Sequence, residues 1–270
     1  MLTIGLDVHH CTSTLHILEP GGKGRTVSLR GRPQGVVDWL GGLDQPWELT
    51  FEASCGYGHL YDQLVQLPHA RRVVVAHPGK LAAIFKSKRK HDKADAQTLA
   101  TLLRIDKLPT VWVPPVDLRR WRGLIEHRHY LVRCRARAKN GLRSLLRMHA
   151  IEAPRSLWTR PGMAWLSGAS MPDAIEALRR DQLLTDVERY QEMIERVEKV
   201  LNTLAAEHPA VTLLQTIPGI GPRTAEAFVA YVGDPHRFSR TRDVGAYFGL
   251  IPCQDRSEER SCRERVCVGV

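Results

Sequence analysis

The stretch Ile4-Gly5-Leu6-Asp7-Val8-His9 decides how the N-terminal part of this sequence folds. It belongs to a run from Leu2 to Val8 that alternates and then becomes apolar, which is the pattern of a β-strand. Asp7 stands at the end of that run, where burying a carboxylate costs free energy unless a cation neutralises it. The stretch therefore predicts a core strand that ends in a functional acid.

Working outward from this strand, the sequence predicts a hairpin and then alternating helices and strands. Gly21-Gly22-Lys23-Gly24 predicts the turn between a partner strand at 11–18 and a third strand at 26–29. Further segments follow with helical or strand-like spacing, at 33–43 (helix), 48–52 (strand), 56–67 (helix) and 72–76 (strand). This alternation predicts an α/β domain over residues 1–115.

Three more acids occur where an α/β domain usually carries its chemistry. Glu52 ends the strand at 48–52, and Asp92 and Asp95 open a helix that continues through Leu103. Asp92 and Asp95 are three residues apart and so share one helix face. With Asp7 they make four hard oxygen donors, which suit two Mg²⁺ ions and in-line phosphodiester chemistry.

Each acid also has an ordinary structural explanation. Asp92 is a plausible helix N-cap with Asp95 in the first turn, and Asp7 and Glu52 are then surface acids at strand ends. Taken together, and beside a strongly basic helix, the four acids favour a metal site. His9 and His10 are left out of that site because Mg²⁺ prefers oxygen ligands.

After Pro114-Pro115 the alternation of strands and helices gives way to long helical segments, the first of them strongly basic. Residues 118–148 have helical periodicity and, with Asp117, carry ten Lys or Arg against two Asp or Glu, a net charge of +8. Residues 173–207 are also helical, so we predict an antiparallel hairpin within a helical linker at 116–208. The basic helix is either a solvated face or a nucleic-acid contact surface. Its candidate nucleic-acid contacts are Arg119, Arg120, Arg133, Arg135, Arg137, Lys139 and Arg143.

Composition supports a polyanionic partner and excludes several protein classes. The 270 residues carry 39 Lys or Arg and 29 Asp or Glu, a formal charge of +10. With 43% hydrophobic residues the chain can bury a core, which excludes wholesale disorder. No apolar run approaches the roughly 20 residues of a membrane span, so we expect a cytoplasmic protein without a membrane partner. The six cysteines form no CxxC pair, which argues against a zinc site or a disulfide framework.

The segment Leu214–Glu226 has the form of a helix-hairpin-helix turn. Gly219 and Gly221 allow the backbone N–H groups to meet a phosphate at the start of the next helix, and Arg223 adds a charge there. Such a turn would position DNA without reading its sequence. An ordinary Pro-Gly helix connection is the alternative.

Taken in order, these motifs resemble one family, the DEDD transposases of insertion sequence 110 and its relatives. The resemblance covers Met1 to about Asp255 and rests on five motifs: Gly5-Leu6-Asp7-Val8-His9, Phe51-Glu52-Ala53-Ser54, His91-Asp92-Lys93-Ala94-Asp95-Ala96, Ile217-Pro218-Gly219-Ile220-Gly221-Pro222-Arg223-Thr224-Ala225 and Ala246-Tyr247-Phe248-Gly249-Leu250-Ile251-Pro252.

The resemblance implies a RuvC-like, RNase H-type N-terminal domain whose acids are Asp7, Glu52, Asp92 and Asp95. A coiled helical linker and a small, mostly α-helical transposase domain at 209–255 would follow. It further implies Mg²⁺, a serine nucleophile that forms a 5′-phosphoserine link to DNA, and a structured guide RNA that pairs with donor and target DNA. Pairing would then read the sequence while the protein supplies backbone contacts and chemistry. A homodimer or tetramer is also implied.

Ser257 is the position that matches the family's nucleophile. It follows Gly249-Leu250-Ile251-Pro252 by a few residues, but Glu258 stands where the family has glycine. Residues 256–270 lack periodicity and family likeness, so we expect a non-native tail on a chain that is truncated at its C-terminus. Two other functions fit the same residues: a RuvC-like metal-dependent nuclease or junction resolvase, and an inactive nucleic-acid-binding remnant.

Overall fold

The chain forms two compact units, residues 1–114 and the part from Pro115 onward. The computed structural model describes residues 1–84 and 92–250. Ser257 and the predicted tail lie outside the described residues, as does the side chain of Asp92. Each unit has its own apolar core.

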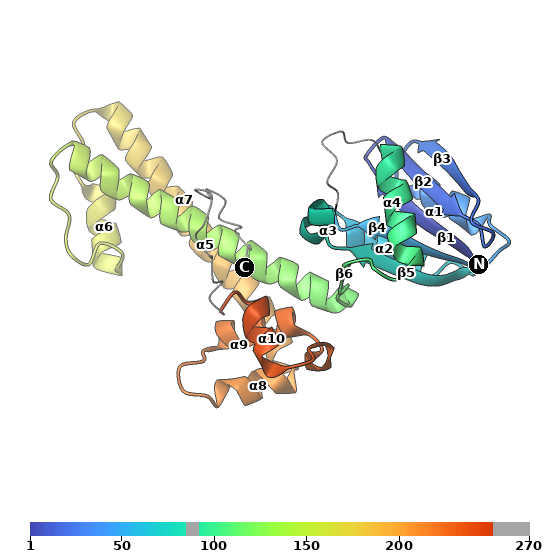
Figure 1. Cartoon of the computed structure of the whole chain (residues 1–270). Coiled ribbons are helices and arrows are strands. Elements are labelled where there is room, and N and C mark those ends of the chain that lie inside the picture. Colours follow the sequence, from blue (N-terminus) through green and yellow to red (C-terminus); the bar gives the residue numbers. More distant parts are fainter. Residues whose placement is uncertain (85–91, 251–270) are drawn as a thin grey trace, which may run out of the picture. The chain divides into compact units, whose positions relative to one another are not determined.

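The first unit is built on a six-stranded mixed sheet in the order β3-β2-β1-β4-β5-β6 (Figure 1). The central β1 (Leu2–Val8) is antiparallel to β2 and parallel to β4, so β1 and β4 end at the same edge of the sheet. The other strands are β2 (Thr12–Leu18), β3 (Gly24–Arg30), β4 (Trp47–Glu52), β5 (Ala70–Ala76) and β6 (Thr110–Val111). This mixed α/β architecture is compatible with a RuvC-like fold.

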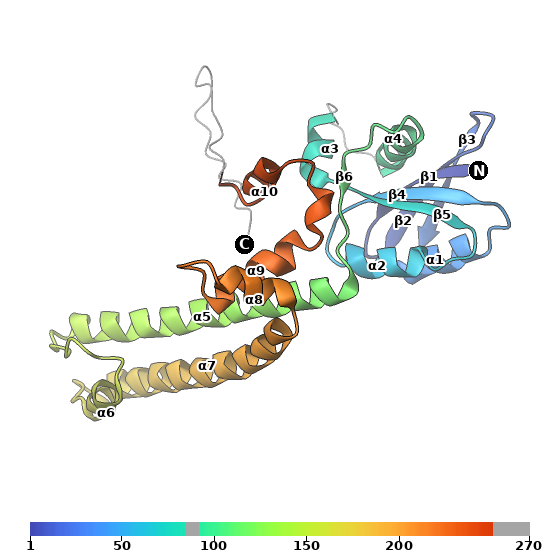
Figure 2. The ribbon, with the colours of Figure 1, turned by 90° about the horizontal axis from the view of Figure 1, so that it is seen from below.

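Helices cover both faces of this sheet (Figure 2). On one face α1 (Gln34–Gly41) and α2 (Tyr57–Leu64) pack against the buried side chains of Ile4 and Leu6. On the other face α4 (Asp92–Arg104) lies across β1 and β2. A short helix, α3 (Pro78–Ile84), follows β5.

The approach of α4 to β1 depends on Gly5. A Cβ atom at Gly5 would lie 2.0 Å from the carbonyl oxygen of Ala96 and 2.5 Å from the backbone nitrogen of Ala100. Both distances are far below van der Waals contact, so no larger residue fits at this position without displacing α4. The glycine before Asp7 thus lets the helix backbone lie directly on the strand that carries the acid.

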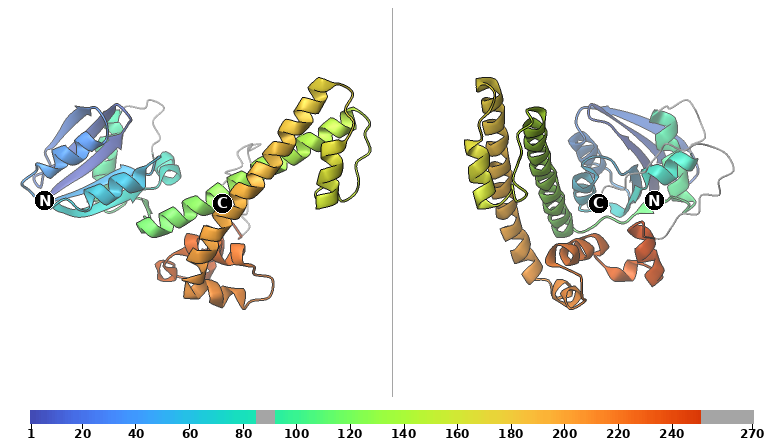
Figure 3. Two further views of the ribbon diagram at one scale, coloured as in Figure 1. Left: turned by 180° about the vertical axis from the view of Figure 1, so that it is seen from behind. Right: turned by 90° about the vertical axis from the view of Figure 1, so that its left-hand side faces the viewer.

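The second unit contains an antiparallel hairpin of two long helices, α5 (Val116–Met148) and α7 (Ala174–Ala206) (Figure 3). Asp173 caps α7, because its Oδ1 accepts hydrogen bonds from the backbone of Ile175 and Glu176 at 2.8 and 2.9 Å. The remaining elements are α6 (Arg160–Gly168), α8 (Pro209–Gln215), α9 (Pro222–Val232), a 3-10 turn (Pro235–Arg237) and α10 (Thr241–Tyr247).

Two apolar clusters hold the hairpin, one toward each end. Leu142, Leu166 and Leu184 are buried where α6 packs on the hairpin. Trp121 and Leu201 are buried where α8 and α9 pack on it. Within the described residues, the structure contains no helix that is both long and apolar enough to cross a membrane.

Candidate metal and nucleic-acid sites

Asp7 and Glu52 lie at the carboxyl ends of neighbouring parallel strands. Leu6 pairs with Phe51, so the next residues of the two strands occupy the same level of the sheet. Asp7 and Glu52 also share a face of the sheet. Thr3 and Glu48 lie on one face, because Thr3 Oγ1 donates a 2.8 Å hydrogen bond to Glu48 Oε1. Since side chains alternate along a strand, the residues four positions further on, Asp7 and Glu52, lie on that face too. Glu52 is exposed, whereas only 18% of the Asp7 side chain is exposed.

The first turn of α4 lies at this same edge of the sheet. At the other end of α4, Arg104 Nη2 donates to the carbonyl oxygens of Glu19 and Pro20 at 2.6 and 3.2 Å, just after β2 ends and near the start of β1. The helix therefore runs antiparallel to β1, and its first turn is near the strand end that carries Asp7. That turn contains Asp92 and Asp95, of which Asp95 is half-buried.

His9 contacts Asp7, although the preference of Mg²⁺ for oxygen ligands excludes His9 from the predicted metal site. Its Nε2 lies 3.2 Å from Oδ2 of Asp7. The spacing of two residues between His9 and Asp7 is visible in the sequence, but the chain turn after β1 that folds the imidazole back is not. This contact makes His9 a neighbour of the Asp7 carboxylate.

The donor chemistry of this edge fits a hard divalent cation. Asp7, Glu52 and Asp95 offer carboxylate oxygens, which are the ligands that Mg²⁺ prefers. The part of the chain that the structure describes contains no set of three His, Cys, Asp or Glu already close enough together to hold a metal ion. The backbone therefore places the acids at one edge, and the assignment of all four as ligands stays a prediction.

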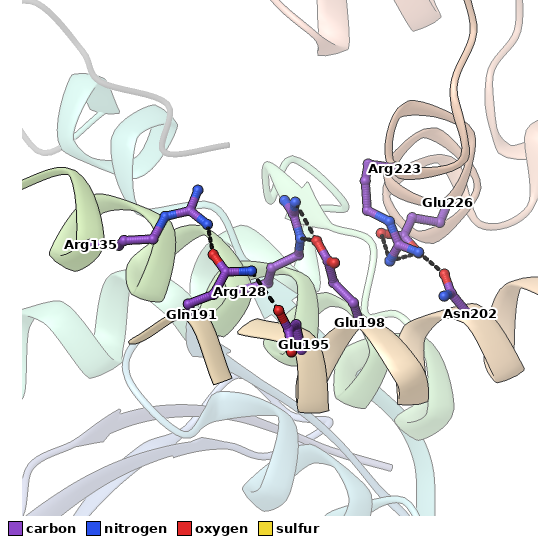
Figure 4. Close-up of polar contacts among 8 residues, drawn as sticks. All are labelled: Arg128, Arg135, Gln191, Glu195, Glu198, Asn202, Arg223 and Glu226. Carbon is purple, nitrogen blue, oxygen red and sulfur yellow. Dashed lines mark hydrogen bonds and ion pairs between the residues drawn. The ribbon is translucent and has the colours of Figure 1, made fainter. Parts of the chain in front are cut away.

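The predicted nucleic-acid contacts of α5 fall into two groups. Arg120, Arg133, Arg137 and Arg143 are exposed, whereas Arg119, Arg135 and Lys139 are half-buried. Arg135 donates from Nη1 to Oε1 of Gln191 on α7 (Figure 4). Burial, followed by the charges of Arg135 and Arg143, lowers the pKa of Lys139.

Other arginines of the basic helix hold the second unit together. Arg128 Nη2 lies 2.6 Å from Glu198 Oε1 on α7, and both side chains are less than a third exposed (Figure 4). Arg122 donates to the carbonyl oxygens of Ala230 and Tyr231 at the end of α9, at 2.8 and 2.9 Å. The excess of positive charge predicts a polyanionic partner, but part of that charge, on Arg128 and Arg122, stabilises the fold instead.

The Ile217–Gly221 segment connects α8 to α9, as its sequence predicts. Gly219 has a φ of +90°, a conformation that glycine adopts without strain, and Gly221 is the N-cap of α9. Arg223 points back into the unit, where it donates to Glu226 at 2.9 Å and to Asn202 (Figure 4). A DNA-binding helix-hairpin-helix at this turn stays a prediction.

Comparison with known proteins identifies the class and then the family. Residues 4–151 match a DEDD transposase domain, and residues 211–269 match the domain described as "Transposase IS116/IS110/IS902 family". The chain therefore belongs to the IS110 family of transposases. A DEDD domain suggests the use of a divalent metal. The second match includes Ser257, and the expected non-native tail stays a prediction.

Two similar curated proteins are named as transposases of insertion sequence elements. The chain is 26% identical over 213 residues to the transposase for insertion sequence element IS1111A of Coxiella burnetii, which covers 77% of this chain and 57% of the relative. It is 28% identical over 216 residues to the transposase for insertion sequence element IS1328 of Yersinia enterocolitica, which covers 77% and 62% respectively. The match thus spans about 60% of the length of these relatives.

Proposed function

We propose that this chain is a transposase that cuts and joins DNA at the ends of an insertion sequence, with Mg²⁺ held by Asp7, Glu52, Asp92 and Asp95. One observation supports the proposal: Asp7 and Glu52 end neighbouring parallel strands at one edge of the sheet, and the first turn of α4 lies at the same edge. Family membership supports the same class of reaction.

The acids would act on a phosphodiester in distinct ways. Mg²⁺ bound at this edge supplies positive charge beside the scissile phosphate. Asp7 is largely buried and is oriented by His9, so it contributes a fixed oxygen donor. Glu52 is exposed at its strand end, so its carboxylate would be accessible to a metal ion and to DNA.

Ser257 is the proposed nucleophile. Its hydroxyl oxygen forms a bond to the DNA phosphorus as the bond from phosphorus to the 3′ oxygen breaks. The serine proton passes by way of solvent to that oxygen, which leaves as a 3′-hydroxyl, and the 5′ phosphate stays attached to the serine. Attack by the 3′-hydroxyl of another strand reverses these steps and joins new ends.

The partners in this proposal are donor DNA, target DNA and a structured guide RNA, with two or four copies of the chain. Base pairing by the RNA would read the sequence, and the basic side chains would hold phosphates. The candidate contacts are Arg119, Arg120, Arg133, Arg135, Arg137, Lys139, Arg143, Arg223 and the turn at Gly219 and Gly221.

The test is expression of the chain together with the non-coding DNA that flanks its gene, followed by detection of DNA covalently attached to protein. We expect an Mg²⁺-dependent adduct that Asp7→Asn and Ser257→Ala both abolish. Asp38→Asn, a matched change at an exposed acid of α1, and Ser261→Ala should both leave it intact.

Two results would overturn parts of the proposal. Mg²⁺-dependent cleavage without an adduct would make water the nucleophile and the protein a RuvC-like nuclease or resolvase. Nucleic-acid binding with neither cleavage nor adduct would make the chain an inactive remnant.

A further inference from the structure

The C-terminal half of α5 carries cations that the fold does not neutralise. Lys139, Arg143 and Arg147 follow one another at four-residue steps, which places them on one stripe of the helix. Among the residues that the structure describes, Arg143 and Arg147 form no ion pair with any carboxylate. This contrasts with Arg128 on the same helix, which is paired with Glu198.

This stripe borders a recess at the tip of the hairpin. The recess has a volume of about 790 Å³, and its walls are the end of α5 and the loop that leads toward α6. Arg143, Arg147 and Arg155 line it together with Asn140, and Glu152 is the acidic residue on its described wall. Three guanidinium groups thus face one carboxylate in a concave surface.

The loop also fixes two of the cations in place. Lys139 Nζ lies 4.8 Å from the ring centroid of Trp158, and the guanidinium carbon of Arg143 lies 5.3 Å from the same centroid. Arg147 Nε donates to the carbonyl oxygen of Arg143 at 3.3 Å. Long side chains that are held in this way lose less conformational freedom when they bind an anion.

Like charges at four-residue spacing repel one another along a helix. In the isolated protein, Arg143, Arg147 and Arg155 line the recess with one described carboxylate, that of Glu152, beside them. An anionic ligand relieves that repulsion and accepts hydrogen bonds from planar guanidinium groups, for which phosphate oxygens are suited.

We propose that the recess formed by Arg143, Arg147, Arg155 and Asn140 binds the sugar-phosphate backbone of a nucleic acid. The inference rests on the proposed function for the nature of the polyanion. It adds a location: phosphates are held at the tip of the helical hairpin, while the paired arginines of α5 stabilise the hairpin itself. RNA and DNA share the chemistry that this site recognises, and the test separates them.

The experiment measures the salt dependence of binding by fluorescence anisotropy on the full chain. The probes are a fluorescein-labelled single-stranded RNA of mixed sequence and a DNA duplex of the same sequence. The site variant is Arg143→Gln with Arg147→Gln and Arg155→Gln. We expect its slope of log affinity against log salt to become shallower by roughly 2 for RNA and roughly 2.7 for duplex DNA, since each phosphate contact contributes about 0.7 for single strands and 0.9 for duplex DNA.

The control variant removes the same number of charges from the same hairpin. Arg189→Gln, Arg196→Gln and Lys199→Gln lie on exposed positions of α7, and together they should leave the slope unchanged. A third variant with lysine at positions 143, 147 and 155 should keep the slope, because it keeps the charges. Circular dichroism on each variant verifies that the helices are intact.

The outcomes are distinct. A shallower slope for RNA alone, DNA alone or both supports the site and identifies its ligand. The proposed site is overturned if the wild type and the site variant have equal slopes. It is also overturned if the slope becomes shallower by the same amount in the site and control variants. Measuring the slopes in EDTA separates this inference from the proposed function, because without Mg²⁺ no cleavage occurs and the contribution of Arg143, Arg147 and Arg155 to the slope should persist.

Discussion

Gly5 lets α4 lie directly on β1, close to the sheet edge at which Asp7 and Glu52 end their strands. The backbone of α4 lies where a side chain on Gly5 would be, and α4 carries Asp95 one residue before Ala96. We predict that Gly5→Ala displaces α4 and destabilises the protein by at least about 1–3 kcal/mol, the usual cost of overpacking. Chemical denaturation measures this change in the free energy of unfolding.

A matched control exists on the opposite face of the sheet. Gly35 lies in α1 and has no neighbouring atom within 4 Å of an added Cβ. Gly35→Ala should therefore be neutral or slightly stabilising, since alanine favours the helix. Equal effects of the two substitutions would show that the contact between Gly5 and α4 does not constrain the fold.

We predict that Glu226 makes the free energy of unfolding depend on pH. It is 1% exposed and paired with Arg223 at 2.9 Å, and burial raises its pKa above the ordinary value of 4.5 despite the arginine. The folded state therefore holds the proton more tightly than the unfolded state does. The resulting stabilisation is fully present below the unfolded pKa and is lost as the pH rises through the folded pKa.

Glu226→Gln tests this sign, because glutamine has nearly the same shape and does not titrate. The free energy of unfolding of the wild type minus that of the variant should fall as the pH rises from below 4.5. Urea denaturation at a series of pH values measures this difference. A difference that is constant or rises with pH would contradict a raised pKa for Glu226.

The candidate acids are visible in the sequence because each has a local signal. Asp7 and Glu52 end apolar strands, and Asp92 and Asp95 have helix spacing, so their pattern predicts a shared edge once the strands are parallel. The orientation of Arg223 toward Glu226 is not predictable, because it depends on a contact between side chains that only the fold brings together. The sequence therefore predicts the positive charge of Arg223 at this turn but not its pairing with Glu226.

The hairpin of α5 and α7 is held by polar contacts that can be measured directly. Arg128 and Glu198 are 2.6 Å apart and partly shielded from water (Figure 4). A double-mutant cycle with Arg128→Ala and Glu198→Ala should give a coupling energy of about 1 kcal/mol or more. Thermal or chemical unfolding of the four proteins provides the numbers.

The exposed pair Arg196 and Glu192 on α7 serves as the comparison. These groups are 3.7 Å apart, and more than two thirds of each side chain is exposed. Their cycle should give no more than about 0.5 kcal/mol, as is usual for exposed helical ion pairs. Equal coupling energies in the two cycles would contradict the view that Arg128 stabilises the hairpin.

Long helices are predictable from the sequence, and the shortest elements are not. Apolar periodicity predicts helices at 118–148 and 173–207, and the structure has α5 and α7 at nearly these bounds. The same periodicity does not predict α3, β6 or α6. β6 has only two residues and exists because it pairs with β5, so its sequence alone carries no strand signal.

The candidate acids and the basic hairpin lie in different units of the chain. Residues 1–114 contain the acids and a core of their own around Ile4, Leu6 and Leu49. The second unit contains the basic hairpin and separate cores around Leu201 and Leu142. Because each unit buries its own apolar residues, we predict that fragments 1–114 and 115–270 fold independently, each with a cooperative unfolding transition.

The fragments should also separate metal binding from nucleic-acid binding. Mg²⁺ should stabilise fragment 1–114 by about 2.7 kcal/mol at a concentration one hundred times its Kd, since it binds only the folded state. Asp7→Asn in that fragment should abolish this effect, and Asp38→Asn should not. Fragment 115–270 should keep the salt-dependent binding of RNA or DNA, because it contains Arg143, Arg147 and Arg155. If Mg²⁺ stabilised both fragments equally, or if the salt slope followed fragment 1–114, the acids and the hairpin arginines would not perform the separate tasks assigned to them.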